Sequence, residues 1–101
     1  MARNRKTDFQ EDLLESLKNP NEAVEYLKAA LEERDMPELF LTALRDVAEA
    51  KGIRNLAQET ELNRENLYRM LSQNGNPELR SLCAILDSLG LKLSVEKKVA
   101  S

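Results

Sequence analysis

The stretch Ile53–Gly75, IRNLAQETELNRENLYRMLSQNG, decides how this chain folds. It predicts two short helices joined by a tight turn at Glu61-Leu62-Asn63, because apolar residues recur at helical spacing on both sides of that turn. The first helix is expected over residues 54–60, with Leu56 and Ala57 inward. A residue as small as Ala57 allows the second helix to cross closely, so the stretch reads as a helix-turn-helix.

The second helix is expected to begin at Arg64, with Asn63 as its cap, because an asparagine side chain can accept a backbone N–H of the first turn. Leu67 and Leu71, together with Met70, lie at helical spacing and should face the core. The outer face then carries five hydrogen-bonding side chains: Arg64, Glu65, Asn66, Tyr68 and Arg69. Any two-helix corner of an all-helical protein could share the inward pattern, so the polar outer face carries the functional argument.

The composition predicts one small all-α domain. The chain has 101 residues, of which 42% are hydrophobic, 33% charged and only 4% aromatic. Cys83 is the single cysteine and histidine is absent, so neither an internal disulfide nor a His/Cys metal site is expected, and no cofactor is indicated. No apolar run is long enough for a signal peptide or a membrane span, which favours a cytoplasmic protein.

Three helical segments are expected before the motif. Asp8 should cap a short amphipathic segment that Asn19-Pro20 ends, Asn21 should cap a helix over residues 22–34, and Asp35 should cap a third helix that Gly52 ends. The three apolar stripes are Phe9, Leu13, Leu14 and Leu17 in the first segment, Ala23, Val24, Leu27, Ala30 and Leu31 in the second, and Leu39, Phe40, Ala43, Leu44, Val47 and Ala48 in the third. The basic residues Arg3, Arg5 and Lys6 precede them as a tail or as an arm that contacts DNA.

A last helix should follow the motif. Asn74-Gly75 is expected to stop the second motif helix in a left-handed conformation, and Asn76-Pro77-Glu78 to start the next, which Gly90 closes. Its expected inward residues are Leu79, Leu82, Cys83, Ile85, Leu86 and Leu89, which makes Cys83 a small core hydrophobe.

The residues after Gly90 alternate between apolar and polar side chains. Leu91, Leu93 and Val95 alternate with Lys92, Ser94 and Glu96, the period of a half-buried strand. A lone strand needs a partner, and the chain has no second strand signal. We therefore expect the same strand of another copy to pair with it antiparallel, as a homodimer.

Charge divides the chain into two halves. Residues 1–50 carry 7 basic and 12 acidic side chains, a net charge of −5, whereas residues 51–101 carry 8 and 6, a net charge of +2. The halves should therefore have different partners. We predict an acidic N-terminal helical extension over residues 1–35, a helix-turn-helix domain over 36–95 and a polar tail over 96–101.

The order of these blocks resembles a known family. Leu56-Ala57 through Leu71, followed by Asn76-Pro77 and the block LDSLGL at residues 86–91, resembles the Xre/Cro-type helix-turn-helix. With the upstream blocks YLKAALE and LFLTALRDVAEAKG, the chain from Asp8 to Val95 is similar to the putative addiction-module antidote proteins, a HigA-like antitoxin group. One departure is Glu61, where that family usually has a glycine that readily adopts a left-handed conformation.

The resemblance implies an antitoxin of a type II toxin-antitoxin module, which neutralises a RelE/HigB-like toxin by direct binding and represses its own operon. The fold it implies is a small Xre/Cro-like bundle with an N-terminal helical extension and a possible short C-terminal strand. Because a helix in the major groove reads base edges with its N-terminal side chains, the expected base-contacting residues are Arg64, Glu65, Asn66 and Arg69. The expected phosphate-contacting residues are Arg54, Asn55, Asn63 and Tyr68, although Tyr68 could instead cover apolar atoms.

The toxin is expected to bind the acidic half. Charge there would complement a basic RNA-cutting enzyme, and the stripe of Phe9, Leu13, Leu14 and Leu17 would supply an apolar anchor unless it packs on the domain's own core. Two alternatives remain open: a solitary Xre-family regulator, or a protein-interaction module that does not bind DNA, which the negative net charge favours. Catalysis is not expected, because the chain lacks histidine, a glycine-rich phosphate loop and a nucleophile elbow. Neither a membrane nor a small-molecule substrate is expected as a partner.

Overall fold

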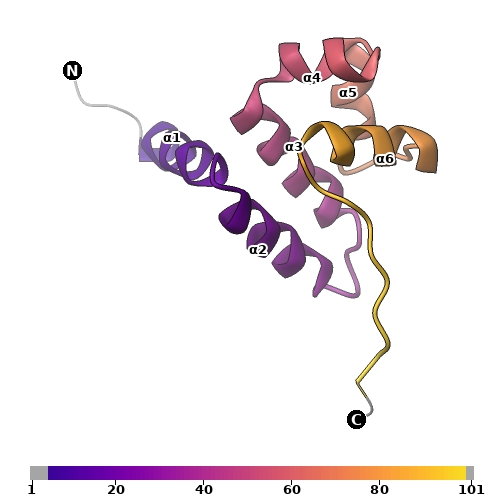
Figure 1. The fold of residues 1–101 in the computed structure, drawn as a ribbon. Helices are drawn as coiled ribbons and strands as arrows, with labels where there is room; N and C mark the ends of the chain where they lie inside the picture. The colour runs from indigo at the N-terminus through magenta and orange to yellow at the C-terminus, as the bar shows by residue number, and fades with distance from the viewer. Residues whose placement is uncertain (1–4, 100–101) are drawn as a thin grey trace.

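The computed structural model describes residues 5–99, with side chains from Phe9 onward, so Arg3 and the side chains of Arg5 and Lys6 lie outside the described part. Its helices are α1 (Arg5–Leu17), α2 (Pro20–Leu31), α3 (Leu39–Lys51), α4 (Ile53–Thr60), α5 (Arg64–Met70) and α6 (Leu79–Ser88). The described residues contain no strand, which confirms the all-α fold class. In Figure 1, α1 and α2 run consecutively along one side of α3, while α4, α5 and α6 gather on its other side.

The first two helices differ from their expected bounds. Helix α1 begins at Arg5, upstream of the expected cap Asp8. The prediction that Asn21 caps the next helix is wrong, because the Oδ1 of Asn19 accepts the backbone N–H of Asn21 at 2.8 Å. Pro20 then occupies the first helical position, where its fixed φ suits the helix and no N–H is needed. The helix ends at Leu31 instead of Arg34, and Leu31 is exposed.

Helix α3 is entered through turns instead of a side-chain cap. The N–H of Leu39 donates to the carbonyl of Met36 at 3.0 Å, and that of Phe40 to Pro37 at 3.1 Å. Glu38 is the residue at the N-cap, so the expected role of Asp35 is wrong. At the other end Gly52, at a φ of 107°, turns the chain directly into α4.

One core joins the N-terminal helices to the rest of the bundle. Leu17 of α1 and Leu27 of α2 belong to the same buried cluster as Leu44 and Val47 of α3. The cluster continues through the later helices with Leu56, Leu67, Leu71, Ile85, Leu86 and Leu89. The division of the chain at residue 35 stays a prediction, but the hydrophobic contacts cross it.

Helix α6 starts later than expected and buries a narrower face. The residue at its N-cap is Glu78 in an extended conformation, so Pro77 lies before the helix and Asn76 does not cap it. The side chains of Leu79 and Cys83 are exposed, and their expected place in the core is wrong. On a helix both residues lie at the edge of the stripe that Leu82, Ile85, Leu86 and Leu89 form, turned toward solvent.

Gly75 and Gly90 are needed for different structural reasons. Gly75 is not left-handed, contrary to expectation. A Cβ there would lie 2.0 Å from the carbonyl oxygen of Met70, so the position needs a residue without a side chain. Gly90 does close α6, at a φ of 78°, and the N–H of Leu91 donates back to the carbonyl of Leu86 at 2.8 Å. This is the hydrogen bond of a Schellman helix end.

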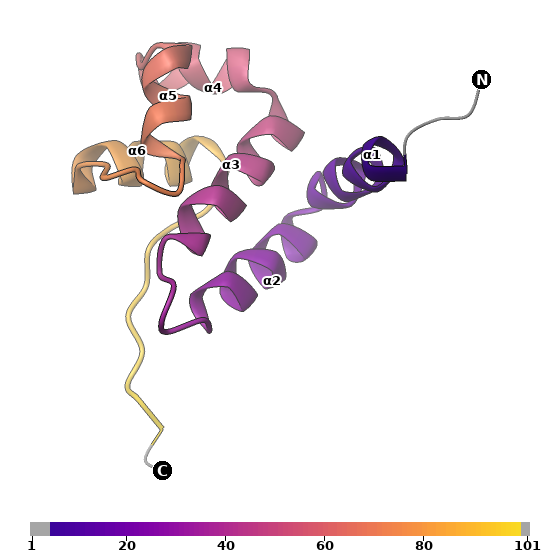
Figure 2. The same cartoon turned by 180° about the vertical axis from the view of Figure 1, so that it is seen from behind.

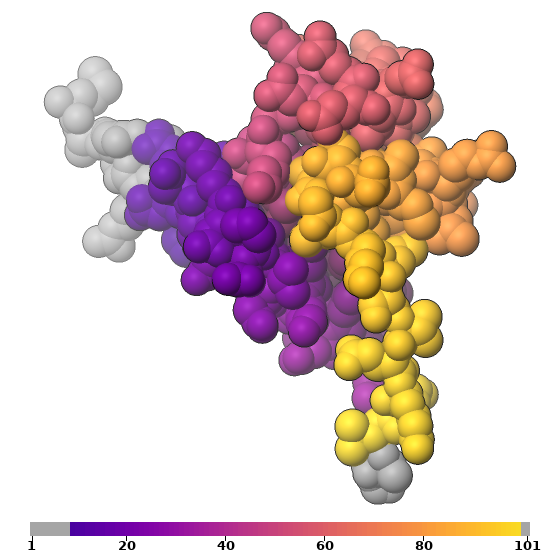
Figure 3. All heavy atoms as spheres, in the orientation of Figure 1, coloured from indigo at the N-terminus to yellow at the C-terminus, as the bar shows by residue number. Residues whose placement is uncertain are grey.

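Residues 91–99, called the C-terminal arm below, leave the bundle in an extended conformation without regular secondary structure. Figure 2 shows the same course from behind, with the arm running away from α6. In the space-filling view of Figure 3 it projects beyond the helices. The alternation of Leu91, Leu93 and Val95 therefore finds no strand partner within the described part of the chain.

Candidate nucleic-acid interface

The turn between α4 and α5 is built by its own side chains. The hydroxyl of Thr60 donates to the carbonyl of Leu56 at 2.7 Å and accepts the N–H of Leu62 at 3.4 Å. Glu61 follows in the left-handed conformation, at φ 60° and ψ 25°. Glycine adopts this backbone most easily, and glycine is the residue that the resembled family usually has at this position. Leu62 is half-buried between the two helices.

Helix α5 begins and packs as expected. The Oδ1 of Asn63 accepts the backbone N–H of Asn66 at 2.7 Å, which satisfies one of the free donors of the first turn. Leu67 and Leu71 are fully buried, and Met70 is packed against the core beside them. With α5 fixed by this inner face, its opposite face is turned to solvent.

The exposed face of α5 carries most of the residues predicted to contact bases. Arg64, Glu65 and Arg69 are exposed, and Asn66 is half-buried between them. The Oδ1 of Asn66 accepts a hydrogen bond from the guanidinium of Arg69, so these two side chains form one unit one helical turn apart. Arg64 and Glu65 extend from the first turn of the helix.

The residues predicted to contact phosphate lie at two helix starts. Arg54 and Asn55 are exposed in the first turn of α4, where backbone N–H groups have no partner within the helix. Asn63 is exposed at the start of α5, although its side-chain oxygen is already engaged as the cap. Tyr68 is 37% exposed.

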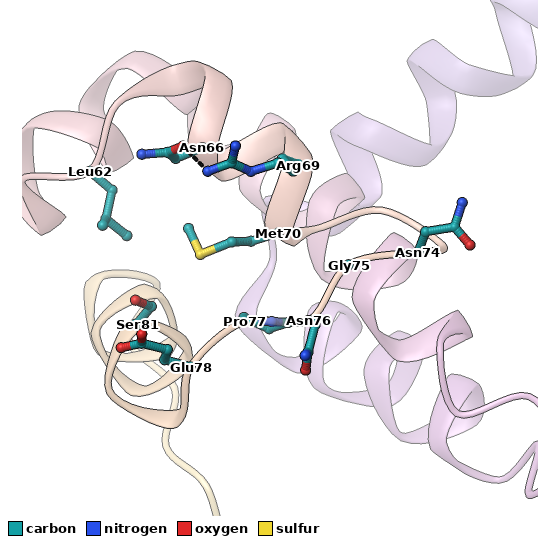
Figure 4. Close-up of a pocket in the computed structure, with 10 residues that line it drawn as sticks. All are labelled: Leu62, Asn66, Arg69, Met70, Asn74, Gly75, Asn76, Pro77, Glu78 and Ser81. Carbon is teal, nitrogen blue, oxygen red and sulfur yellow. Dashed lines mark hydrogen bonds between the residues drawn. The ribbon is translucent and has the colours of Figure 1, made fainter.

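A hollow of about 470 Å³ lies between α5 and the start of α6, and the sequence did not indicate it. Figure 4 shows Asn66 and Arg69 on one side of it, Glu78 and Ser81 on the other, and the Met70 side chain directed between them. The sequence signal that could have revealed it is the run Asn74-Gly75-Asn76-Pro77, which cannot continue a helix and leaves space between its flanking helices.

The structure separates the apolar residues predicted to bind a partner protein. Leu17 is buried in the core, and Leu13 is packed against it. Leu14 is half-buried, whereas Phe9 is 69% exposed. The stripe therefore serves the protein's own core at one end and is open to solvent at the other. The exposed side chains of α1 and α2 include the carboxylates Glu11, Asp12, Glu15, Glu22 and Glu25.

Residues 5–99 contain no cluster of three or more His, Cys, Asp or Glu side chains that could hold a metal ion. Within the same residues, no helix has both the length and the apolar character required to cross a membrane.

The probable addiction module antidote proteins match residues 7–97 of this sequence. The chain belongs to this family. An uncharacterised protein of Haemophilus influenzae is 35% identical over 86 residues, which cover 85% of this chain and 88% of that protein. No solved structure matches. The word antidote in the family's description implies a toxin as partner.

Proposed function

We propose that this protein is the antitoxin of a type II toxin-antitoxin module, that it binds a RelE/HigB-like toxin directly, and that as a homodimer it represses its own operon. Membership of the antidote family supports the antitoxin role. The observation that carries the DNA-binding part is the pair α4 and α5, a helix-turn-helix in which Leu67 and Leu71 are buried and the opposite face is polar and exposed.

Helix α5 is the proposed reader of the major groove. Its first turn would enter the groove, where Arg64 can donate to the two acceptors of a guanine and Glu65 can accept from a cytosine amine. The bond from Arg69 to Asn66 holds the guanidinium along the helix, in a suitable position to contact a base further along the same strand. Arg54, Asn55 and Asn63 would contact phosphates at the helix starts and fix the orientation.

The toxin is proposed to bind the acidic half. An RNA-cutting enzyme must hold a phosphate backbone, so its working surface should be basic. The exposed carboxylates of α1 and α2 complement such a surface and would speed the encounter. Phe9, which is 69% exposed on α1, is the proposed apolar anchor.

A second function is favoured by one observation. The net charge of −3 is unusual for a DNA-binding domain, and it suits an interaction module that does not bind DNA. A solitary repressor without a toxin is a further alternative. Residues 51–101 carry a net charge of +2, which a dimer would double. This local positive charge favours DNA binding over an interaction module that does not bind DNA.

One paired experiment tests the proposal. The purified protein is titrated onto DNA from upstream of its own gene at 50 and 200 mM salt, and is separately mixed with the product of the neighbouring reading frame. Binding that weakens steeply with salt is expected for DNA, because phosphate neutralisation releases counterions. A stable complex with a small basic neighbour is expected for the toxin. Absence of a DNA complex at low salt, with the toxin complex intact, would support the interaction module.

A further inference from the structure

The C-terminal arm offers an unpaired strand edge. The N–H of Leu91 donates to Leu86, but from Lys92 to Val99 no backbone hydrogen bond to another described residue is formed. Leu93 is 47% exposed and Val95 is 96% exposed. Free backbone groups beside exposed apolar side chains are the features that a second strand would cover.

The arm also borders an apolar groove. This groove, of about 560 Å³, has Val24 and Leu31 of α2 and Phe40 of α3 on one wall, and arm residues that include Leu93 on the other. Leu31 is 55% exposed there. A strand laid beside the arm would shield Leu93 and reduce the apolar surface that the groove leaves open to water.

We propose that the arm of a second copy is that strand, paired antiparallel about a two-fold axis that passes through Ser94. The inference rests on the homodimer of the proposed function and gives it a specific surface. It does not depend on the binding of DNA or toxin.

The sequence of the arm selects this register. With Ser94 opposite Ser94 of the partner, Lys92 faces Glu96 of the partner and Leu93 faces Val95 of the partner, each pair occurring twice. Opposite charges and apolar side chains directly across an antiparallel pair stabilise it. All the apolar side chains then share one face of the ribbon.

The neighbouring two-fold registers lose these pairs. With Leu93 on the axis, Lys92 faces Ser94 of the partner, so the pair with a glutamate is lost. With Val95 on the axis, Lys92 faces Lys98 of the partner and Leu93 faces Lys97 of the partner. Like charges directly opposite each other destabilise the pair. Of the three registers, the one centred on Ser94 is the one that places a glutamate opposite Lys92 and no like charges opposite each other.

Charge also favours a second copy over the toxin as occupant. The arm carries Lys92, Lys97 and Lys98 against the single acidic Glu96. A basic toxin would be repelled by this segment. The arm of another copy is equally basic, but in this register it places a glutamate opposite each Lys92 and a lysine opposite each Glu96.

Disulfide crosslinking tests the register. In a Cys83→Ser background, Ser94→Cys should form a covalent dimer on mild oxidation, because residues directly opposite each other lie about 4.5–5.5 Å apart at Cα, within the span of a disulfide. The matched control is Lys92→Cys, because residue 92 of one arm would lie about 13 Å along the ribbon from residue 92 of the other. Equal crosslinking of both variants, or none of Ser94→Cys, would overturn the register.

Charge reversal supplies the second arm of the test. Lys92→Glu should raise the dimer dissociation constant about tenfold by sedimentation, since two attractive pairs become repulsive, and adding Glu96→Lys should restore it. An unchanged dimer dissociation constant in Lys92→Glu would contradict the proposed pairing of the two arms. Operator and toxin binding, measured on the same variants, report separately on the proposed function, which survives if the dimer uses another surface.

Discussion

The hydroxyl of Tyr26 on α2 donates to the Oδ2 of Asp46 on α3 at 2.6 Å. Burial, followed by the hydrogen bond and the negative charge of Asp46, raises the pKa of Tyr26 to about 12. The neutral phenol donates to the carboxylate, whereas a phenolate would repel it. This bond therefore ties the acidic N-terminal helices to the part of the chain that carries the proposed DNA interface.

Removal of this hydroxyl should weaken the fold in a pH-dependent manner. Tyr26→Phe is expected to lower the free energy of unfolding by about 1–2 kcal/mol near neutral pH, as loss of a hydrogen bond to a charged group does. Because the folded-state pKa is raised, the stabilisation is fully present below the ordinary pKa of tyrosine, about 10, and is lost as the pH rises through the folded-state value. Urea unfolding of both proteins from pH 8 to 12 measures the difference.

Tyr68→Phe is the matched control for this experiment, because the Tyr68 side chain is exposed on α5. It should leave the free energy of unfolding nearly unchanged. A difference between wild type and Tyr26→Phe that stayed constant up to pH 12 would contradict the proposed tie.

The inner face of α5 is expected to dominate stability. Leu67 has no exposed surface, so Leu67→Ala should lower the free energy of unfolding by about 2–5 kcal/mol, the usual cost of truncating a buried leucine. Arg64→Ala, on the exposed face of the same helix, is the control and should change it by less than about 0.5 kcal/mol. Equal effects of the two substitutions in urea unfolding would mean that the faces are assigned wrongly.

The turn at Glu61 stores a small strain that glycine should relieve. A non-glycine residue in the left-handed region costs roughly 1 kcal/mol, part of which the greater freedom of an unfolded glycine offsets. Glu61→Gly should therefore raise the melting temperature slightly. Gln58→Gly, at an exposed position inside α4, should instead lower it. A lower melting temperature for Glu61→Gly would contradict the proposed backbone strain at Glu61.

Local signals correctly predicted how α5 begins and which face it buries. The cap at Asn63 and the burial of Leu67 and Leu71 each depend on chemistry within a few residues, which the sequence displays directly. The polar face of α5 follows from the same periodicity. Its role in DNA binding stays a prediction.

Other features depend on competition that a sequence does not display. Asn19 and Asn21 are both capable caps, and the position of Pro20 between them decided for Asn19. Leu79 and Cys83 have the spacing of a buried stripe, but the neighbours of α6 cover only the adjacent face. Position 75 requires glycine because a Cβ there would clash with the carbonyl oxygen of Met70. These two residues approach each other only in the folded turn.

Substitutions on the outer face of α5 should change base preference without unfolding the protein. Arg64→Ala or Arg69→Ala is expected to lose about 1–3 kcal/mol of discrimination at one base position in each half-site, because a bidentate arginine-guanine contact is removed. Competition binding against operator variants measures this loss. Unchanged operator affinity and specificity in both variants would contradict the proposal that α5 reads bases in the major groove.

The last prediction separates toxin binding from folding. A protein that begins near Asn21 would test the N-terminal segment poorly, because it lacks Leu17, which is only 2% exposed within the core. Leu17→Ala should accordingly lower the free energy of unfolding by about 2–5 kcal/mol. Phe9→Ser should not lower stability, since Phe9 is 69% exposed.

If Phe9 is the apolar anchor for the toxin, Phe9→Ser should weaken the toxin complex at least about tenfold, as truncation of an interface anchor does. Gln10→Ser, at the exposed position beside it, is the control for local disturbance of α1. Calorimetric titration of the toxin with each variant gives the affinities, and operator binding should be the same in both. Undiminished toxin affinity in Phe9→Ser would exclude the anchor and leave the carboxylates of α1 and α2 as the remaining candidates on this surface.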